Sequence, residues 1–232
     1  MNTTSHTSCI PVRRLLLGTS TAIAVLLAAA SVAQANPITI FNTGVDANHA
    51  VLGDATIGDP HYSLISAPEG STFNIRVRRA SGGFPIETGA YFGDNSYSNW
   101  IGPNNDEVLN GPPGLYVYRT TFDLTGLNPA TAKLSGQWSS DNEGRDIELN
   151  GESTAVAPTS SGAFTSFHPF SITGGFISGI NILDFFVVND GADPTALRVE
   201  ISGTAAEVPE PATLALVGLS LAALGWSRRK KQ

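Results

Sequence analysis

The chain has 232 residues, a single cysteine and a formal net charge of −7. Six of its 13 basic residues lie near the two ends, at positions 13–14 and 228–231. Residues 36–207 keep 7 basic and 19 acidic residues, a net charge near −12. Such a surface repels polyanions, so nucleic acid and anionic lipid are not expected partners.

The N-terminus has the three parts of a secretory signal peptide. Arg13-Arg14 is followed by an apolar stretch over residues 15–30 and then by Ala33-Gln34-Ala35, a small-x-small cleavage pattern. We expect residues 1–35 to be removed, and the mature chain to begin at Asn36. The only cysteine, Cys9, precedes the apolar stretch, so the mature chain has no thiol, disulfide or cysteine-ligated metal.

Residues 36–207 predict one all-β domain. No segment keeps a 3.6-residue apolar period, whereas residues 72–78, 115–124 and 197–202 alternate between apolar and polar positions. Residues 180–188 are apolar on both faces except at Asn181 and Asp184, which predicts a central strand. Asn150-Gly151 predicts a two-residue hairpin turn. Many short strands with frequent turns favour a two-sheet antiparallel sandwich of jelly-roll type.

The last segment, residues 208–232, has three parts in fixed order. Pro209, Glu210 and Pro211 hold the chain extended, because proline fixes φ and lacks an N–H donor. An uncharged apolar run over residues 212–226 follows and predicts a short transmembrane helix. A basic cluster closes the chain and would stay in the cytoplasm, which leaves the domain outside. Its members are Arg228, Arg229, Lys230 and Lys231.

This order of parts resembles the PEP-CTERM sorting signal of exported proteins in Gram-negative bacteria. The resemblance implies export across the inner membrane, membrane attachment through the C-terminal helix, and processing by an exosortase. The processed protein would then lie at the cell surface or outside the cell. An ordinary C-terminal membrane anchor is the alternative. The resemblance also implies an exopolysaccharide or another glycan as a partner.

A second resemblance covers about half of residues 36–207. Four segments are similar to those of galactose-binding-like jelly-roll modules: the run from Tyr116 to Leu124 (YVYRTTFDL), the segment Leu134 to Trp138, Asp141-Asn142, and Leu149-Asn150-Gly151. This resemblance implies a β-sandwich that binds carbohydrate through its loops and carries a structural calcium ion. Oxygen ligands for calcium could come from one acidic segment, at Asp141, Asn142, Glu143 and Asp146.

A polar segment with several aromatic residues, residues 91–106, gives the candidate ligand site. Sugars are recognised by aromatic faces that stack on C–H surface and by amides or carboxylates that bind hydroxyls. The expected ligand residues are Asp94, Asn95, Tyr97, Asn99 and Trp100. The alternative is that Trp100 and Trp138 are core residues and that the polar residues build turns. For Tyr97, the alternative to a sugar platform is an anchor that holds its loop to the sandwich.

The sequence offers no recognised catalytic motif. His49, His61 and His168 lack metal-ligand spacing, and the mature chain lacks the G-x-S-x-G serine-hydrolase elbow. We therefore expect a non-catalytic exported protein that binds polysaccharide and needs no cofactor besides the calcium of the resemblance. Two alternatives stay open. One is a glycan-acting hydrolase or lyase with a carboxylate pair, and the other is a structural matrix component without a ligand.

Overall fold

The computed structural model describes residues 35–103 and 110–208, together with 218, 219, 222 and 226. The predicted signal peptide, apart from Ala35, lies outside this part, as do the Pro-Glu-Pro motif and the basic cluster. The tail residues Gly218, Leu219, Ala222 and Trp226 are helical. Within the described part of the chain, we find no helix with both the length and the apolar character that a membrane span needs.

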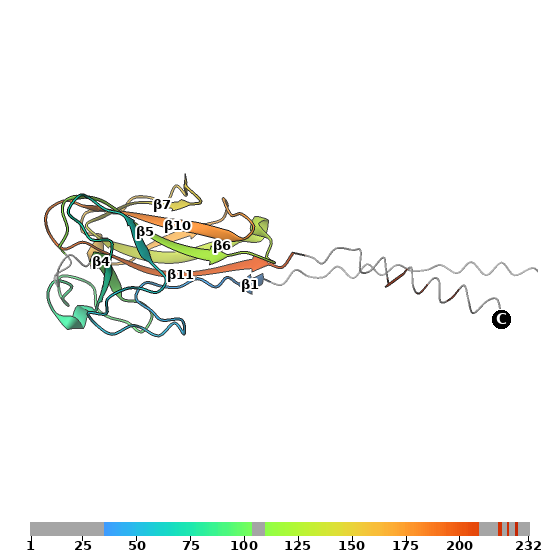
Figure 1. Ribbon diagram of the computed structural model, residues 1–232, viewed down its shortest axis with the longest axis horizontal. Helices are drawn as coiled ribbons and strands as arrows, with labels where there is room; N and C mark the ends of the chain where they lie inside the picture. Colours follow the sequence, from blue (N-terminus) through green and yellow to red (C-terminus); the bar gives the residue numbers. More distant parts are fainter. Residues whose placement is uncertain (1–34, 104–109, 209–217, 220–221, 223–225, 227–232) are drawn as a thin grey trace, which may run out of the picture. The chain divides into compact units, whose positions relative to one another are not determined.

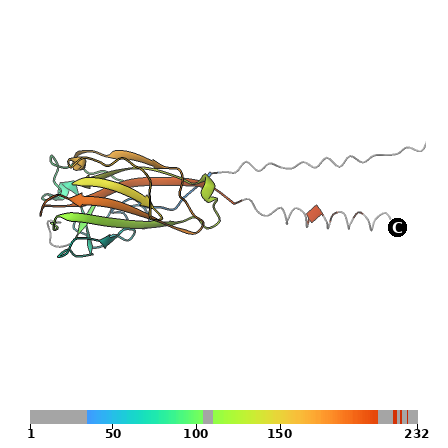
Figure 2. The same ribbon diagram turned by 90° about the horizontal axis from the view of Figure 1, so that it is seen from above.

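The domain consists of two antiparallel sheets, and most connections along the chain pass from one sheet to the other (Figures 1 and 2). The six-stranded sheet contains β1 (Ala35–Pro37), β3 (Ile75–Arg78), β4 (Trp100–Pro103), β6 (Lys133–Asp141), β9 (His168–Ile172) and β11 (Ala196–Ala206). The five-stranded sheet contains β2 (Ser63–Ser66), β5 (Gly114–Asp123), β7 (Glu143–Leu149), β8 (Glu152–Ser153) and β10 (Ile180–Asn189).

The strand order identifies the architecture. Strands β4 to β11 pair in the orders β4-β11-β6-β9 and β5-β10-β7-β8. These eight strands thus form two four-stranded layers. Chain neighbours cross between the sheets except at the β7–β8 hairpin, which is the jelly-roll arrangement. The predicted fold class is confirmed. Three short 3₁₀ turns complete the elements, at η1 (Ala80–Gly82), η2 (Pro129–Thr131) and η3 (Ala163–Thr165).

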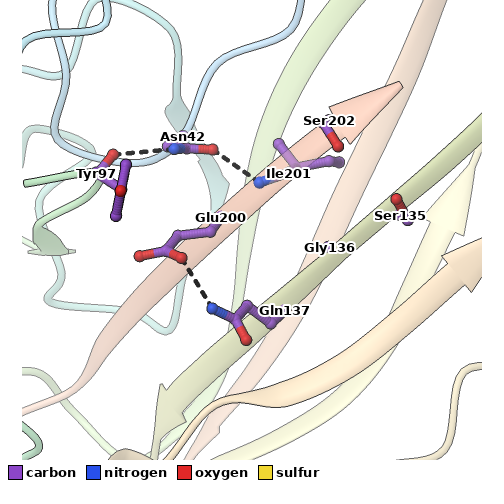
Figure 3. Close-up of a pocket in the computed structure, with 8 residues that line it drawn as sticks. All are labelled: Asn42, Tyr97, Ser135, Gly136, Gln137, Glu200, Ile201 and Ser202. Atoms are coloured by element: carbon purple, nitrogen blue, oxygen red, sulfur yellow. Dashed lines mark hydrogen bonds between the residues drawn. The ribbon is translucent and has the colours of Figure 1, made fainter. Parts of the chain in front are cut away.

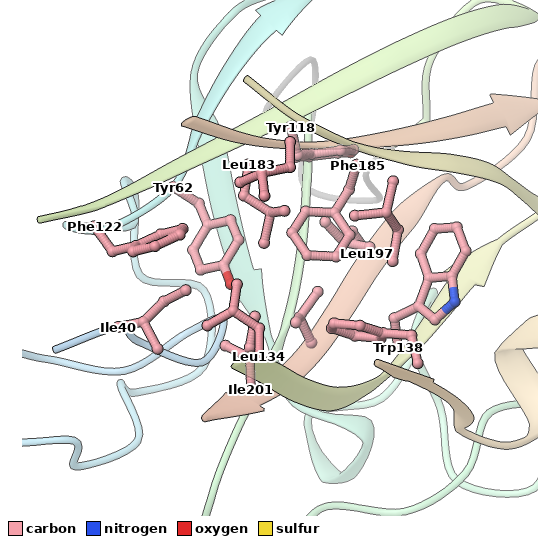
Figure 4. Packing of buried hydrophobic residues seen from close by; sticks show 14 of the residues in the cluster. Ile40, Tyr62, Tyr118, Phe122, Leu134, Trp138, Leu183, Phe185, Leu197 and Ile201 are labelled. Carbon is pink, nitrogen blue, oxygen red and sulfur yellow. The ribbon is translucent and has the colours of Figure 1, made fainter. Parts of the chain in front are cut away.

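The core lies between the sheets and is filled by the inward residues of both (Figure 4). Alternation predicted this for β5, where Tyr116, Tyr118 and Phe122 are buried. Trp138 is fully buried, with its ring centroid 6.0 Å from that of Phe185. Trp138 is therefore a core residue.

The central strand and the hairpin are also confirmed. β10 pairs with β5 on one side and β7 on the other. Its buried Asp184 accepts two hydrogen bonds from Arg119, at 2.7 and 2.6 Å. Asn150 and Gly151 adopt positive φ angles of 55° and 85° between β7 and β8, as a tight two-residue turn requires.

Two alternation predictions are wrong. Phe73 was expected to share the buried face of Ile75 and Val77, but β3 begins only at Ile75 and Phe73 is 57% exposed. Arg198 was expected on an open polar face, but it is fully buried. It does lie on the outer face of its sheet, where residues 92–98 cover it.

Candidate functional site

A surface pocket lies on the outer face of the six-stranded sheet, over β6 and β11 (Figure 3). Two cross-strand pairs form its floor, because Glu200 lies opposite Gln137 and Ser202 lies opposite Ser135 in the register. Residues opposite each other in antiparallel strands point to the same face. The cavity has a volume of about 430 Å³ and is lined by Asn42, Tyr97, Ser135, Gly136, Gln137, Glu200, Ile201 and Ser202.

Glu200 is the centre of the hydrogen-bond network at this pocket. One carboxylate oxygen accepts from Asn95 Nδ2 at 2.5 Å and from Ser98 Oγ at 2.8 Å. The other accepts from Gln137 Nε2 at 2.8 Å (Figure 3). Since a carboxylate has about four acceptor positions, Glu200 keeps capacity for one further donor.

The loop that carries Tyr97 is held at both backbone groups of that residue. Asn95 Oδ1 accepts from the Tyr97 N–H at 2.9 Å, and Asn42 donates to the Tyr97 carbonyl at 2.9 Å. Asn42 also accepts from the Ile201 N–H at 2.7 Å, which ties the loop to β11 (Figure 3). The Tyr97 side chain is 64% exposed and lines the pocket. A fixed backbone thus presents an accessible aromatic ring.

Arg198 supports this loop from below. Its Nε donates to Ser98 Oγ at 2.8 Å, its Nη2 to the Ser98 carbonyl at 2.9 Å, and its Nη1 to the Gly93 carbonyl at 3.1 Å. The guanidinium lies 4.7 Å from the centroid of the Phe92 ring. Burial lowers the pKa of Arg198 to about 10, and the nearby carboxylate of Glu200 opposes that shift. The group stays a cation at neutral pH.

The structure separates the five residues predicted as ligand contacts. Tyr97 lines the pocket, and Asn95 binds Glu200 at its edge. Asp94 instead accepts from the Ala80 and Ser81 N–H groups, at 2.6 and 3.0 Å. Although burial raises the pKa of Asp94, the hydrogen bonds from Ser81 and Ala80 and the charge of Arg79 lower it overall. Asp94 therefore holds the loop over η1.

Asn99 and Trp100 are fully buried, which corrects their prediction as ligand contacts. Asn99 donates to the Leu52 carbonyl at 2.8 Å. Trp100 packs edge-on against Tyr91, with ring centroids 5.3 Å apart, in a second apolar cluster. Both side chains belong to the packing below the loop. The remaining loop residues at 104–106 lie outside the described part.

The predicted calcium ligands do not converge. Asp141 ends β6 in one sheet, whereas Glu143 and Asp146 belong to β7 in the other. Buried Asp141 accepts from the Tyr91 hydroxyl and from Asn142 Nδ2, and Asp146 accepts from Ser153 Oγ at 3.1 Å. Within residues 35–103 and 110–208, no three His, Cys, Asp or Glu side chains are grouped to hold a metal. These residues do not fit the six or more oxygens of a calcium site.

The histidines have packing roles in the structure. His61 stacks on Phe41, with ring centroids 3.5 Å apart, and its N–H is bound by Asp59 in a turn. His49 stacks on Phe41 at 4.6 Å. His168, in β9, is half-buried and lies opposite Trp138 of β6. None of the three lines the pocket over β6 and β11.

Sequence reasoning missed Asn42, Gln137 and Glu200. It placed Glu200 on the outward face of the last strand, but it had no means to pair that strand with β6. The sequence showed these two pocket residues, Gln137 and Glu200, only as polar positions in two segments about 60 residues apart. The register of β6 and β11 is what brings Gln137 and Glu200 together.

Two solved structures show limited similarity to this chain. The CBM35 from Paenibacillus barcinonensis is 14% identical, with a TM-score of 0.32, over 64% of this chain and 98% of its own. The CBM36-1 domain of a multidomain xylanase from the hindgut metagenome of Trinervitermes trinervoides is also 14% identical, with a TM-score of 0.29, over 49% and 82%. At these scores the fold assignment depends on the strand order alone.

No curated protein matches the chain in sequence. The family model of the PEP-CTERM protein-sorting motif matches residues 207–230. This match covers the three-part tail and confirms the resemblance drawn from Pro209-Glu210-Pro211, the apolar run and the basic cluster. The chain therefore carries a PEP-CTERM protein-sorting motif directly behind a jelly-roll domain.

Proposed function

We propose that this protein is exported across the inner membrane of a Gram-negative bacterium, sorted by an exosortase, and binds polysaccharide without catalysis. The sorting proposal is supported by the motif match at residues 207–230. Before processing, the C-terminal helix would hold the domain at the membrane. After processing, the domain would contact glycan at the cell surface or outside the cell.

The binding proposal is carried by Tyr97. Its ring is exposed, yet hydrogen bonds to Asn95 and Asn42 fix its backbone. A fixed aromatic ring beside the Glu200 and Gln137 side chains combines a stacking surface with hydrogen-bonding groups for hydroxyls. An anchoring role for Tyr97 is not supported, because a residue that is 64% exposed contributes little to the core.

The composition of the pocket favours binding over hydrolysis. Among its lining residues, Glu200 is the only carboxylate. Most glycoside hydrolases need two carboxyl groups across the scissile bond. Glu200 also accepts three hydrogen bonds from neighbouring side chains, so the network holds it as a fixed acceptor.

The test is a glycan array with the mature exported protein, followed by sugar-release assays on every hit. Tyr97→Ala should abolish binding while the melting temperature stays nearly unchanged. Tyr97→Phe is the matched control and should keep most of the affinity, because it retains the ring. Loss of stability in Tyr97→Ala would favour an anchor instead. Unchanged binding by Tyr97→Ala would remove this pocket as the site, and release of sugar would show an enzyme.

A further inference from the structure

The pocket over β6 and β11 has one charged lining residue, and that residue is negative. Apart from Glu200, its lining consists of amide, hydroxyl, tyrosine, glycine and isoleucine residues. The uncharged surface extends onto β9, where exposed Pro169 lies opposite Gln137 and exposed Ser171 lies opposite Ser135. A glycan laid across these strands would therefore meet a carboxylate and neutral groups.

The basic residues of β11 and β6 offer no donor group to a ligand in the pocket. Arg198 is two positions from Glu200 but is fully buried, with its guanidinium bound to Ser98 and Gly93. Lys133 precedes Ser135 by two positions on the same face of β6, but it does not line the pocket. The domain as a whole is acidic, which adds to the negative potential at this face.

We propose that the pocket selects glycans without carboxylate, sulfate or phosphate groups, and that Glu200 determines this specificity. The inference depends on the proposed function of the pocket as a glycan site. Sugar hydroxyls can donate to the remaining acceptor position of Glu200. An acidic sugar in the same position would place two like charges together in a partly desolvated site, which works against binding.

Glu200→Gln removes the charge and can keep the network. In the glutamine side chain, the amide oxygen can take the place of the carboxylate oxygen that accepts from Asn95 and Ser98. The amide NH₂ group takes the place of the second carboxylate oxygen. It can donate to the Gln137 side-chain oxygen if the Gln137 amide rotates by 180°. Glu152→Gln is the matched control, because it removes one carboxylate from exposed β8 in the other sheet.

The experiment measures affinity for galactan, mannan and cello-oligosaccharides, each beside its C6-carboxylated form. Wild type should bind a neutral form and bind the carboxylated partner at least about tenfold more weakly. Glu200→Gln should reduce that difference to about threefold or less, whereas Glu152→Gln should leave it unchanged. Ser202→Lys adds a positive charge at an exposed position of the pocket and should raise the affinity for the carboxylated form. This variant replaces Glu200→Gln in the experiment if Glu200→Gln folds poorly.

The outcomes separate the two proposals. Equal or tighter Tyr97-dependent binding of carboxylated glycans by wild type would overturn the specificity inference and leave the glycan-binding function intact. Discrimination that persists in Glu200→Gln and in Ser202→Lys would overturn the assignment to Glu200. If no glycan of either kind binds, the proposed function fails, and the specificity inference fails with it.

Discussion

Arg198 and Ser98 are joined by two hydrogen bonds, one to the Ser98 hydroxyl at 2.8 Å and one to its carbonyl at 2.9 Å. The same hydroxyl donates to Glu200 at 2.8 Å. A buried cation thus connects through one serine to the carboxylate on the pocket floor. Tyr97 is the chain neighbour of Ser98, so its position depends on this contact.

Arg198→Met should destabilise the domain by about 2–4 kcal/mol, because it leaves the buried Ser98 carbonyl, and also the Gly93 carbonyl, without its donor. Amide hydrogen exchange at Tyr97 and Ser98 should accelerate more than exchange in β10. Arg145→Met is the control, since Arg145 is exposed and pairs with Glu143 at 3.4 Å. Equal stability of both variants would show that Arg198 does not support the loop.

Asp141 gives the domain a pH-dependent stability. Burial raises the pKa of Asp141 to about 6, the Tyr91 hydrogen bond lowers it, and the charges of Asp193 and Asp190 raise it further. The folded state therefore holds a proton that the unfolded state loses near pH 4. The free energy of unfolding should fall as pH rises from about 4 to about 6, by up to about 3 kcal/mol.

Asp141→Asn should remove this contribution, so its stability relative to wild type should rise across the same pH window. Denaturant unfolding at several pH values measures the difference. Asp193→Asn is an intermediate control. It removes a neighbouring charge that raises the pKa of Asp141, so it should narrow the pH range over which the stability falls. A constant difference between Asp141→Asn and wild type from pH 4 to 7 would contradict the raised pKa.

Gly144 lies against the ring of Trp138, and a Cβ at Gly144 would sit 2.4 Å from the ring carbon Cη2. Gly144→Ala should therefore cost about 1–3 kcal/mol through overpacking and shift the fluorescence of Trp138. Gly162→Ala is the matched control, because a Cβ there meets nothing within 4 Å and its φ is −95°. Matching melting temperatures for the two variants would mean that the core relaxes around the added methyl.

Replacing Pro209, Glu210 and Pro211 with alanines should block processing, so the protein should stay at the inner membrane with its apolar tail attached. Mass spectrometry of the C-terminus checks this outcome. Deleting residues 228–231 is a separate test. Under the proposed sorting it should weaken membrane retention before processing, because these charges would hold the end of the tail in the cytoplasm. If the alanine variant has the same mature C-terminus as the wild type, the processing enzyme does not recognise this motif.

Period-two patterns predicted the sheets well because burial on one face selects apolar residues at alternate positions. They failed at Arg198, where a loop covers the outer face and the guanidinium satisfies carbonyls of that loop. They failed at Phe73, which lies two residues before the start of β3 at Ile75. Local alternation contains no information about which distant segment covers a face.

The candidate site was only partly predictable for the same reason. Tyr97 stood out because it is an aromatic residue in a polar loop, and it does line the pocket. Trp100, in the same loop by sequence, begins β4 and is buried. Glu200 and Gln137 meet through the pairing of β6 with β11, which depends on the whole topology.

The pairing of β1 with β11 joins the first and last strands of the domain, with Asn36 opposite Ala205 (Figure 1). β11 also pairs with β4 and β6 in the same sheet. During secretion the N-terminal strand emerges first and the strand it needs emerges last. The six-stranded sheet can therefore close only when residue 206 has passed the translocation channel. The domain can thus complete its fold only when export of the chain has reached the sorting motif at residues 207–230.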